Sequence, residues 1–254
     1  MQDVRIVQDF HPGASTASGF NVSYRLGKLQ QRGILVGRWL DFGCADGGYT
    51  SALLAAGADS AVGIDTEGDR IAEARTNYAG ENKLSFVHNE DATLPFSDNS
   101  FDGCFMNEVL EHVYDEVTTL RELFRVLRPG GYLVVISPNR GFPFECHGAQ
   151  IGPMKLGFPV PLLPWLPPRL GQRFMNARNY WPSEMRALVA LPGFLVASPD
   201  FVWPVLDFYR WLPGGLRQWY LRHIARFDSM PVIRRLGVSV LLVAQKPALA
   251  PSRA

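Results

Sequence analysis

Two acidic residues and two histidines near the middle of the chain have types and spacings that suit joint chemistry. Glu108, Glu111 and His112 lie three and four residues apart, so a helix would place their side chains on one face. His147 follows a later apolar run and would join them if the two segments end neighbouring strands. Carboxylate oxygens and imidazole nitrogens together suit Mg, Mn, Fe or Zn. These four residues are therefore candidate metal ligands.

Two other interpretations of these residues need no metal. His112 could take a proton from a hydroxyl group as a general base, and Glu145 and His147 are further candidate acids or bases. Alternatively, Glu108 is an ordinary residue near a helix start, where the helix dipole favours an acid, and the histidines are ordinary side chains of a cleft and a loop. The sequence leaves these interpretations open.

A glycine-rich turn follows the first strong apolar run of the chain. It spans 43–48 (Gly-Cys-Ala-Asp-Gly-Gly), just after Asp41. Such a turn lets the backbone approach a ligand, and the helix that follows offers free N–H groups. A second apolar run ends in Asp65, which could accept both hydroxyls of a ribose. The turn lacks the G-x-G-x-x-G spacing that seats a pyrophosphate, and Asp46 would repel one. We therefore expect a cationic, nucleoside-bearing cofactor.

This turn resembles the first motif, D-x-G-x-G-x-G, of class I S-adenosylmethionine (SAM)-dependent methyltransferases. Asp41, Gly43 and Gly47 match the motif, and Ala45 replaces its middle glycine. Three later segments resemble later motifs of the family in the same order; they are 89–96, 98–102 and 125–131. The resemblance covers roughly 36–138 and is of the small-molecule type. The Glu-x-x-Glu-His pattern is similar to ubiquinone-biosynthesis O-methyltransferases and, with a later histidine, to small-RNA 2′-O-methyltransferases.

The resemblance implies SAM, or its product S-adenosylhomocysteine (SAH), as the cofactor. The implied binding residues are Asp41, Gly43, Cys44, Ala45, Gly47, Asp65, Thr66, Asp91, Ala92 and Asn107. In the family pattern the loop 43–47 brackets the methionine part, and Asp65 holds the ribose. Asp91 and the Ala92 N–H bind the adenine, and the Asn107 backbone lies near the sulfonium.

The alternation of apolar runs and helical patterns predicts an α/β fold, because parallel strands need helices on both faces. We expect a Rossmann-like seven-stranded sheet with helices on both faces and strands at 38–42, 60–64, 84–88, 101–106, 132–137, 194–203 and 237–246. Helices are expected at 22–32, 113–127 and 182–191. Residues 1–35 would form an N-terminal lid segment, and 36–254 the methyltransferase domain.

Two inserts rich in proline and aromatic residues are expected after strands 5 and 6, at about 138–180 and 204–235. Proline at this density forbids long helices and central strands. The inserts would form a lid over an apolar substrate, an interfacial surface, or additional core. The apolar stretch 154–175 has few charges and could rest on a membrane surface.

Composition narrows the function classes. The chain has 25 basic and 24 acidic residues, so no basic excess indicates a nucleic-acid partner. Three cysteines indicate a reducing compartment, and no run of 18 apolar residues spans a membrane. We expect a cytoplasmic protein with a peripheral membrane contact.

The expected function is methyl transfer, at oxygen, to a small acceptor that is apolar or linked to a lipid or glycan. Two alternatives are an RNA 2′-O-methyltransferase with a Glu/His metal site and a non-catalytic SAM-fold partner subunit, which Ala45 in the glycine loop favours. The oligomeric state is open.

Overall fold

The computed structural model describes residues 19–157, 159–171, 173–203 and 213–248. Part of the expected lid segment, residues 1–18, therefore lies outside the described residues. So does Phe158 of the first insert. The same holds for 204–212, which includes Phe208, Tyr209, Arg210 and Trp211 of the second insert.

The first half of the chain alternates helices and strands at the expected places. The elements are α1 (Gly19–Gln30), β1 (Arg38–Phe42), α2 (Gly48–Ala56), β2 (Ser60–Asp65), α3 (Gly68–Asn77), β3 (Leu84–His88), β4 (Phe101–Asn107), α4 (Glu116–Val126) and β5 (Leu127–Pro138). All five strands pair in parallel. The apolar pattern was thus sufficient to predict the five strands and the helices α1 and α4, whereas no helix was expected at α3.

The central sheet has the strand order β10-β12-β5-β4-β1-β2-β3, with β10 (Leu195–Val196), β11 (Asp200–Val202) and β12 (Ser239–Gln245) at one side. The expected α/β fold with a Rossmann-like sheet is confirmed. The sixth expected strand, 194–203, is interrupted: β10 and β11 pair separately with β12. Pro199 lies in the gap, and proline cannot donate a hydrogen bond to a neighbouring strand.

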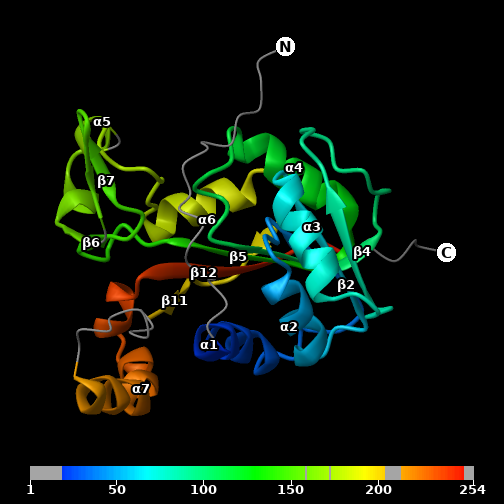
Figure 1. The fold of residues 1–254 in the computed structure, drawn as a ribbon, viewed down its shortest axis with the longest axis horizontal. Coiled ribbons are helices and arrows are strands. Elements are labelled where there is room, and N and C mark those ends of the chain that lie inside the picture. Colours follow the sequence, from blue (N-terminus) through cyan, green and yellow to red (C-terminus); the bar gives the residue numbers. More distant parts are fainter. Residues whose placement is uncertain (1–18, 158, 172, 204–212, 249–254) are drawn as a thin grey trace.

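Helices cover both faces of the sheet (Figure 1). Adjacent residues of β1 point to opposite faces, as a strand requires. Trp39 packs with Leu53 of α2 and Leu26 of α1 in one core. Leu40 packs in the other core with Leu120 of α4, and α6 (Pro182–Ala190) adds to that core. Both cores are deeply buried and fix the strands that carry the site.

The junction between α4 and β5 differs from the expected one. The next strand was expected to begin only at residue 132, but α4 ends at Val126 and β5 begins at the next residue. The register of β5 against β4 shifts between Phe101 and Gly103. Pro129 has no N–H to donate and Gly130 has φ +81°, so the three residues form an irregularity within the strand.

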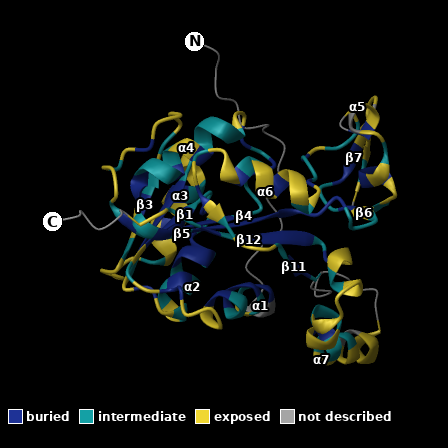
Figure 2. Cartoon of the chain, turned by 180° about the vertical axis from the view of Figure 1, so that it is seen from behind, coloured by how far each residue is buried: buried dark blue, intermediate teal, exposed yellow. Residues whose placement is uncertain are grey.

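The two inserts contain only short elements, except for one helix. The first contains β6 (Phe144–Glu145), β7 (Ala149–Ile151), β8 (Met154–Leu156), β9 (Val160–Pro161), the 3₁₀ helix η1 (Leu163–Trp165) and α5 (Pro168–Gly171). The second contains α7 (Gly214–Ser229) and η3 (Ile233–Leu236). Both lie at the end of the sheet where β5 leads into β6 (Figure 1), and both carry many exposed residues (Figure 2). No helix in the described part of the chain is long and apolar enough to cross a bilayer.

Gly103 of β4 packs directly against the ring of Trp39. A Cβ at this position would lie 2.3 Å from Trp39 Cε2, so Gly103→Ala should destabilise the fold by about 2 kcal/mol through overpacking. Gly27→Ala, in α1, is the control because a Cβ there meets nothing within 4 Å; it should stabilise by about 0.5 kcal/mol. Urea unfolding of the two variants measures both effects. Equal stability of Gly103→Ala and the wild type would contradict this packing.

Candidate active site

The expected cofactor residues lie along one edge of the sheet. The strand order β4-β1-β2-β3 places the carboxyl ends of these strands side by side. Asn107 ends β4, the loop 43–47 follows β1, Asp65 ends β2, and Asp91 follows β3. Ligands of open α/β sheets bind beyond the carboxyl ends of the strands. The fold therefore brings together residues that are far apart in the sequence.

The glycine loop approaches its neighbours so closely that side chains are excluded at two positions. Gly43 has φ +78°, and a Cβ there would lie 2.4 Å from Val109 Cγ2. Gly47 has φ +83°, and its Cβ would lie 2.7 Å from the Phe86 ring. Between them Ala45 has φ +47°, a left-handed conformation that costs an L-residue energy. The backbone is thus strained at Ala45, where the family motif has a glycine.

Two buried or half-buried carboxylates hold this loop. Asp41 Oδ2 accepts a hydrogen bond from Thr50 Oγ1 of α2 at 2.7 Å. Burial raises the pKa of Asp41 to about 7, against the opposing effect of the Thr50 hydrogen bond. Asp65 Oδ2 accepts a hydrogen bond from the Ala45 N–H at 2.8 Å, which ties the loop to β2.

The remaining cofactor candidates occupy different environments. The Cys44 side chain is buried and packs against the backbone of Gly63, so only the backbone of Cys44 is available to a cofactor. Burial also raises the pKa of the Cys44 thiol. The Thr66 carbonyl lies 3.0 Å from His88 Nε2. Asp91 and Ala92 are exposed, and Asn89 Nδ2 donates a hydrogen bond to the Asp91 carbonyl at 2.8 Å.

The segment after β4 is a turn, so the helical spacing expected for the Glu-x-x-Glu-His pattern is wrong. Glu108 has φ +55°, and its N–H donates to the Ile136 carbonyl at 2.8 Å. The chain then turns through 110–112, and α4 begins only after its N-cap, Asp115. The β4–β5 hydrogen bonds thus continue to Glu108 and prevent a helix there. Glu108, Glu111 and His112 therefore do not share one face of a helix.

Arg25 of α1 holds Glu108 in this position, a role that nothing in the sequence signalled. Its Nη1 lies 2.8 Å from Glu108 Oε1 and 2.5 Å from Asn107 Oδ1. Ser239 Oγ also donates to Glu108 Oε1, at 2.5 Å. Burial alone would raise the pKa of Glu108, but the charges of Arg25 and His147 and the Ser239 hydrogen bond lower it. Glu108 is therefore an ionised, half-buried partner of α1.

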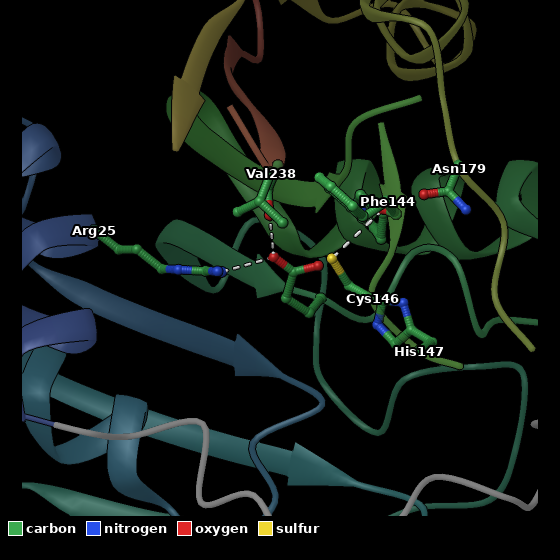
Figure 3. A pocket seen from close by; sticks show the side chains of 9 residues that line it. Arg25, Phe144, Cys146, His147, Asn179 and Val238 are labelled. Atoms are coloured by element: carbon green, nitrogen blue, oxygen red, sulfur yellow. Dashed lines mark hydrogen bonds and ion pairs between the residues drawn. The ribbon is translucent and has the colours of Figure 1, made fainter. Parts of the chain in front are cut away.

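A pocket of about 140 Å³ opens beside this ion pair. Its lining consists of Arg25, Glu108, Pro138, Phe144, Cys146, His147, Asn179, Val238 and Ser239. Figure 3 shows Arg25 reaching in from one side, with His147 and Asn179 on the other. Most of these residues come from the inserts and the strands they join. Sequence reasoning missed Asn179 and Ser239, because neither belongs to a recognisable motif.

Glu111, His112 and His147 form a cluster next to the pocket. Each offers one ligand atom, and the three atoms lie within 4.8 Å of one another. Glu111 Oε1 lies 3.7 Å from His147 Nε2 and 4.0 Å from His112 Nε2. Oε1 accepts no hydrogen bond from the described residues, whereas Oε2 accepts one from Ser137 Oγ at 2.7 Å. The turn and the first insert thus bring together three of the four expected ligands, without Glu108.

Glu145 lies behind His147 rather than in the pocket. It is fully buried and accepts hydrogen bonds from the His147 N–H at 2.8 Å and from Asn179 Nδ2 at 2.5 Å. His147 Nδ1 lies 3.4 Å from Glu145 Oε1. Glu145 therefore orients His147.

The two histidines have opposite protonation tendencies. Burial lowers the pKa of His112 to about 4, and the charge of His147 acts in the same direction. Burial alone would lower the pKa of His147 too, but the hydrogen bond with Glu145 and the charge of Glu111 raise it overall. Burial and the charge of Glu108 raise the pKa of Glu111. His112 is therefore neutral at neutral pH, whereas the surroundings of His147 shift its pKa in the opposite direction.

Comparisons with known proteins agree with this geometry. Residues 40–135 match the family model of a methyltransferase domain. A probable SAM-dependent methyltransferase of Mycolicibacterium smegmatis is 37% identical over 101 residues, which are 40% of this chain and 38% of the relative. An O-methyltransferase of Penicillium expansum is 36% identical over 99 residues, 38% of this chain and 36% of the relative. The match thus spans well under half the length of either relative.

The fold also matches solved structures. A SAM-dependent methyltransferase from Mesorhizobium loti superposes with a TM-score of 0.59 at 15% identity, over 88% of this chain and 97% of that chain. The sheet, the loops at its carboxyl edge and the matched family model all indicate the same class of protein. The chain carries a methyltransferase domain of the class I, SAM-dependent type.

Ala45→Gly should remove the left-handed strain in the glycine loop. Relief of about 1–2 kcal/mol exceeds the extra unfolded-state entropy of glycine, about 0.5–1 kcal/mol, so a net gain of up to about 1 kcal/mol is expected. Ala52→Gly, inside α2, is the matched control and should cost about 1 kcal/mol. Thermal and urea unfolding would compare the two. A loss of stability in both variants would show that Ala45 is not strained.

Proposed function

We propose that this protein is a SAM-dependent methyltransferase that methylates a hydroxyl group of a small acceptor, one that is apolar or linked to a lipid or glycan. The proposal rests on the position of the carboxyl end of β4, between the cofactor edge and the pocket. Asn107 lies on the edge with the expected cofactor residues, and the next residue, Glu108, lines the pocket. A methyl donor and an acceptor held on these two sides would lie next to each other.

The size of the pocket supports an acceptor whose reacting end is small. At about 140 Å³ it resembles cavities that admit one benzene-sized ring. Phe144 and Val238 give it apolar walls, while His147 and Asn179 supply polar groups. The remainder of a larger acceptor would extend outward along the inserts, which supports a lipid-linked or glycan-linked molecule.

The cofactor assignment rests on the carboxylates and the glycine loop. When bound, SAM supplies a methyl group carried on a positively charged sulfur. Asp46 in the loop and Asp65, which accepts a hydrogen bond from the Ala45 N–H, place carboxylates beside the loop, which suits a cation. Gly43 and Gly47 leave the backbone uncovered where a Cβ would otherwise stand. These features fit the cofactor that the family implies.

Methylation of a hydroxyl releases a proton, which the chain must accept. His112 is the neutral imidazole beside the pocket and can receive it directly. His147 lines the pocket itself, and its Nδ1 side is oriented by Glu145. We assign proton removal to His112, with His147 as a polar group of the pocket wall and Glu145 as its positioning residue. The O-methyltransferase relative supports oxygen as the acceptor atom.

The cluster Glu111–His112–His147 would also hold a divalent metal. One carboxylate and two imidazoles match the donor set of catalytic zinc sites, which keep one position open. Glu111 Oε1, which accepts no hydrogen bond from the described residues, fits a ligand role. When bound, such a metal would lower the pKa of an acceptor hydroxyl.

Asp65→Ala should weaken SAH binding at least tenfold. The variant removes the acceptor for the ribose hydroxyls, and hydrogen bonds to charged groups contribute about 1.5–3 kcal/mol. Isothermal titration calorimetry measures the affinity. Asp65→Asn keeps an oxygen for the Ala45 N–H and separates loop distortion from loss of the ribose contact. Asp69→Ala, on the exposed start of α3, is the control and should bind as the wild type does.

Unchanged affinity in Asp65→Ala would overturn the cofactor assignment. Failure of the wild type to bind SAH at all would instead favour a non-catalytic partner subunit.

His147→Ala should abolish metal binding if the cluster is a metal site. The metal-stripped protein would be titrated with Zn²⁺ and Mn²⁺, and one ion per chain is expected for the wild type. His223→Ala, in α7, removes a histidine outside the cluster and should bind normally. Absence of binding in the wild type would leave His112 to act as a base without metal.

A further inference from the structure

The two inserts are strongly basic in a chain that is almost neutral. Residues 138–180 and 213–236 contain ten lysines and arginines but two acidic residues, whereas the whole chain has 25 basic and 24 acidic residues. Neither acidic residue offsets the positive charge at the surface of the inserts. Glu145 is fully buried, and Asp228 forms an ion pair with Lys28 of α1 at 2.5 Å. The exposed charge of the inserts is therefore positive, and the rest of the chain is acidic.

The same inserts expose most of the large apolar side chains. Eleven of the sixteen exposed large hydrophobic residues among the described residues lie in 138–180 and 213–236. In the first insert Leu162 is 57% exposed and Trp165 is 51% exposed. In the second, Trp219 is 47% exposed and Val232 is 77% exposed. Soluble monomers rarely gather so many exposed apolar groups in one region without an interaction there.

The exposed side of α7 combines both properties. Leu216, Trp219, Arg222 and Arg226 follow one another at three- and four-residue spacing, so they share a face. All four are exposed, whereas Ile224 on the other side is buried. Tryptophan beside arginine is typical of helices that lie at the boundary between water and lipid.

Both inserts lie at the end of the sheet that carries the pocket (Figures 1 and 2). The pocket lining includes Phe144 and His147 from the first insert, and Val238 and Ser239 from the start of β12, just after the second. The basic and apolar surface therefore adjoins the pocket from two segments that are distant in the sequence.

We propose that this insert surface, formed by the exposed residues of 154–173 and 214–236, docks on an anionic lipid bilayer. The arginines meet the lipid phosphates, and the tryptophans and aliphatic side chains enter the interface. Exposed aliphatic residues such as Leu162 and Val232 favour lipid over single-stranded RNA, which stacks its bases on aromatic rings. The inference goes beyond methyl transfer and does not depend on it.

Vesicle co-sedimentation tests the docking surface. The full chain should sediment with phosphatidylcholine vesicles that contain phosphatidylglycerol and much less with phosphatidylcholine alone, and added salt should release it. Arg222→Glu with Arg226→Glu should lower the partition coefficient by about tenfold or more. Trp219→Ser should lower it at every salt concentration, because it removes apolar contact.

The control carries the same change in charge away from the inserts. Lys83→Glu with Arg121→Glu alters two exposed residues, one just before β3 and one on α4. Both β3 and α4 lie away from the inserts (Figure 2). The control should sediment as the wild type does. SAH binding and thermal unfolding of every variant separate loss of docking from loss of the fold or of the cofactor site.

Three results would overturn the proposal. One is a wild type that stays in solution with anionic vesicles. Another is an equal loss of binding in the control. The third is tighter binding of a single-stranded RNA oligonucleotide that competes with the vesicles, which would make this an RNA surface.

Discussion

Parallel pairing of β4 with both β1 and β5 is the constraint on which the site depends. It aligns the carboxyl ends of these strands, so that the loop after β1 and the turn after β4 meet. The contact between Gly43 and Val109 is close enough to exclude a side chain at residue 43. The β4–β5 hydrogen bonds also continue to Glu108 and force its left-handed backbone. The cofactor edge and the pocket therefore share one short stretch of chain.

The ion pair between Arg25 and Glu108 connects α1 to that stretch. Both side chains are nearly inaccessible, so each charge would be costly without the other. A left-handed residue held by such a pair is the kind of strain that accompanies functional sites. Because Arg25 also contacts Asn107, α1 contacts both the end of β4 and the pocket wall.

The inserts give the molecule two chemically different parts. The body of the fold is acidic and presents few large apolar side chains to solvent, while the inserts are basic and expose many. One of the inserts also supplies His147, which completes the cluster with Glu111 and His112. The same segments thus shape the pocket wall and the outer surface next to it.

The sequence by itself determined the five parallel strands and most of the helices, because these follow from local periodicity. A motif of fixed spacing placed the expected cofactor residues after those strands. It also named Glu111, His112 and His147 as candidate ligands, together with Glu108. Only the tertiary structure decided that Glu108 belongs with Arg25, that residues 108–114 form a turn, and that Pro129–Gly131 lies within β5. Each of these depends on hydrogen bonds or charges from residues distant in the chain, and local patterns carry no information about such partners.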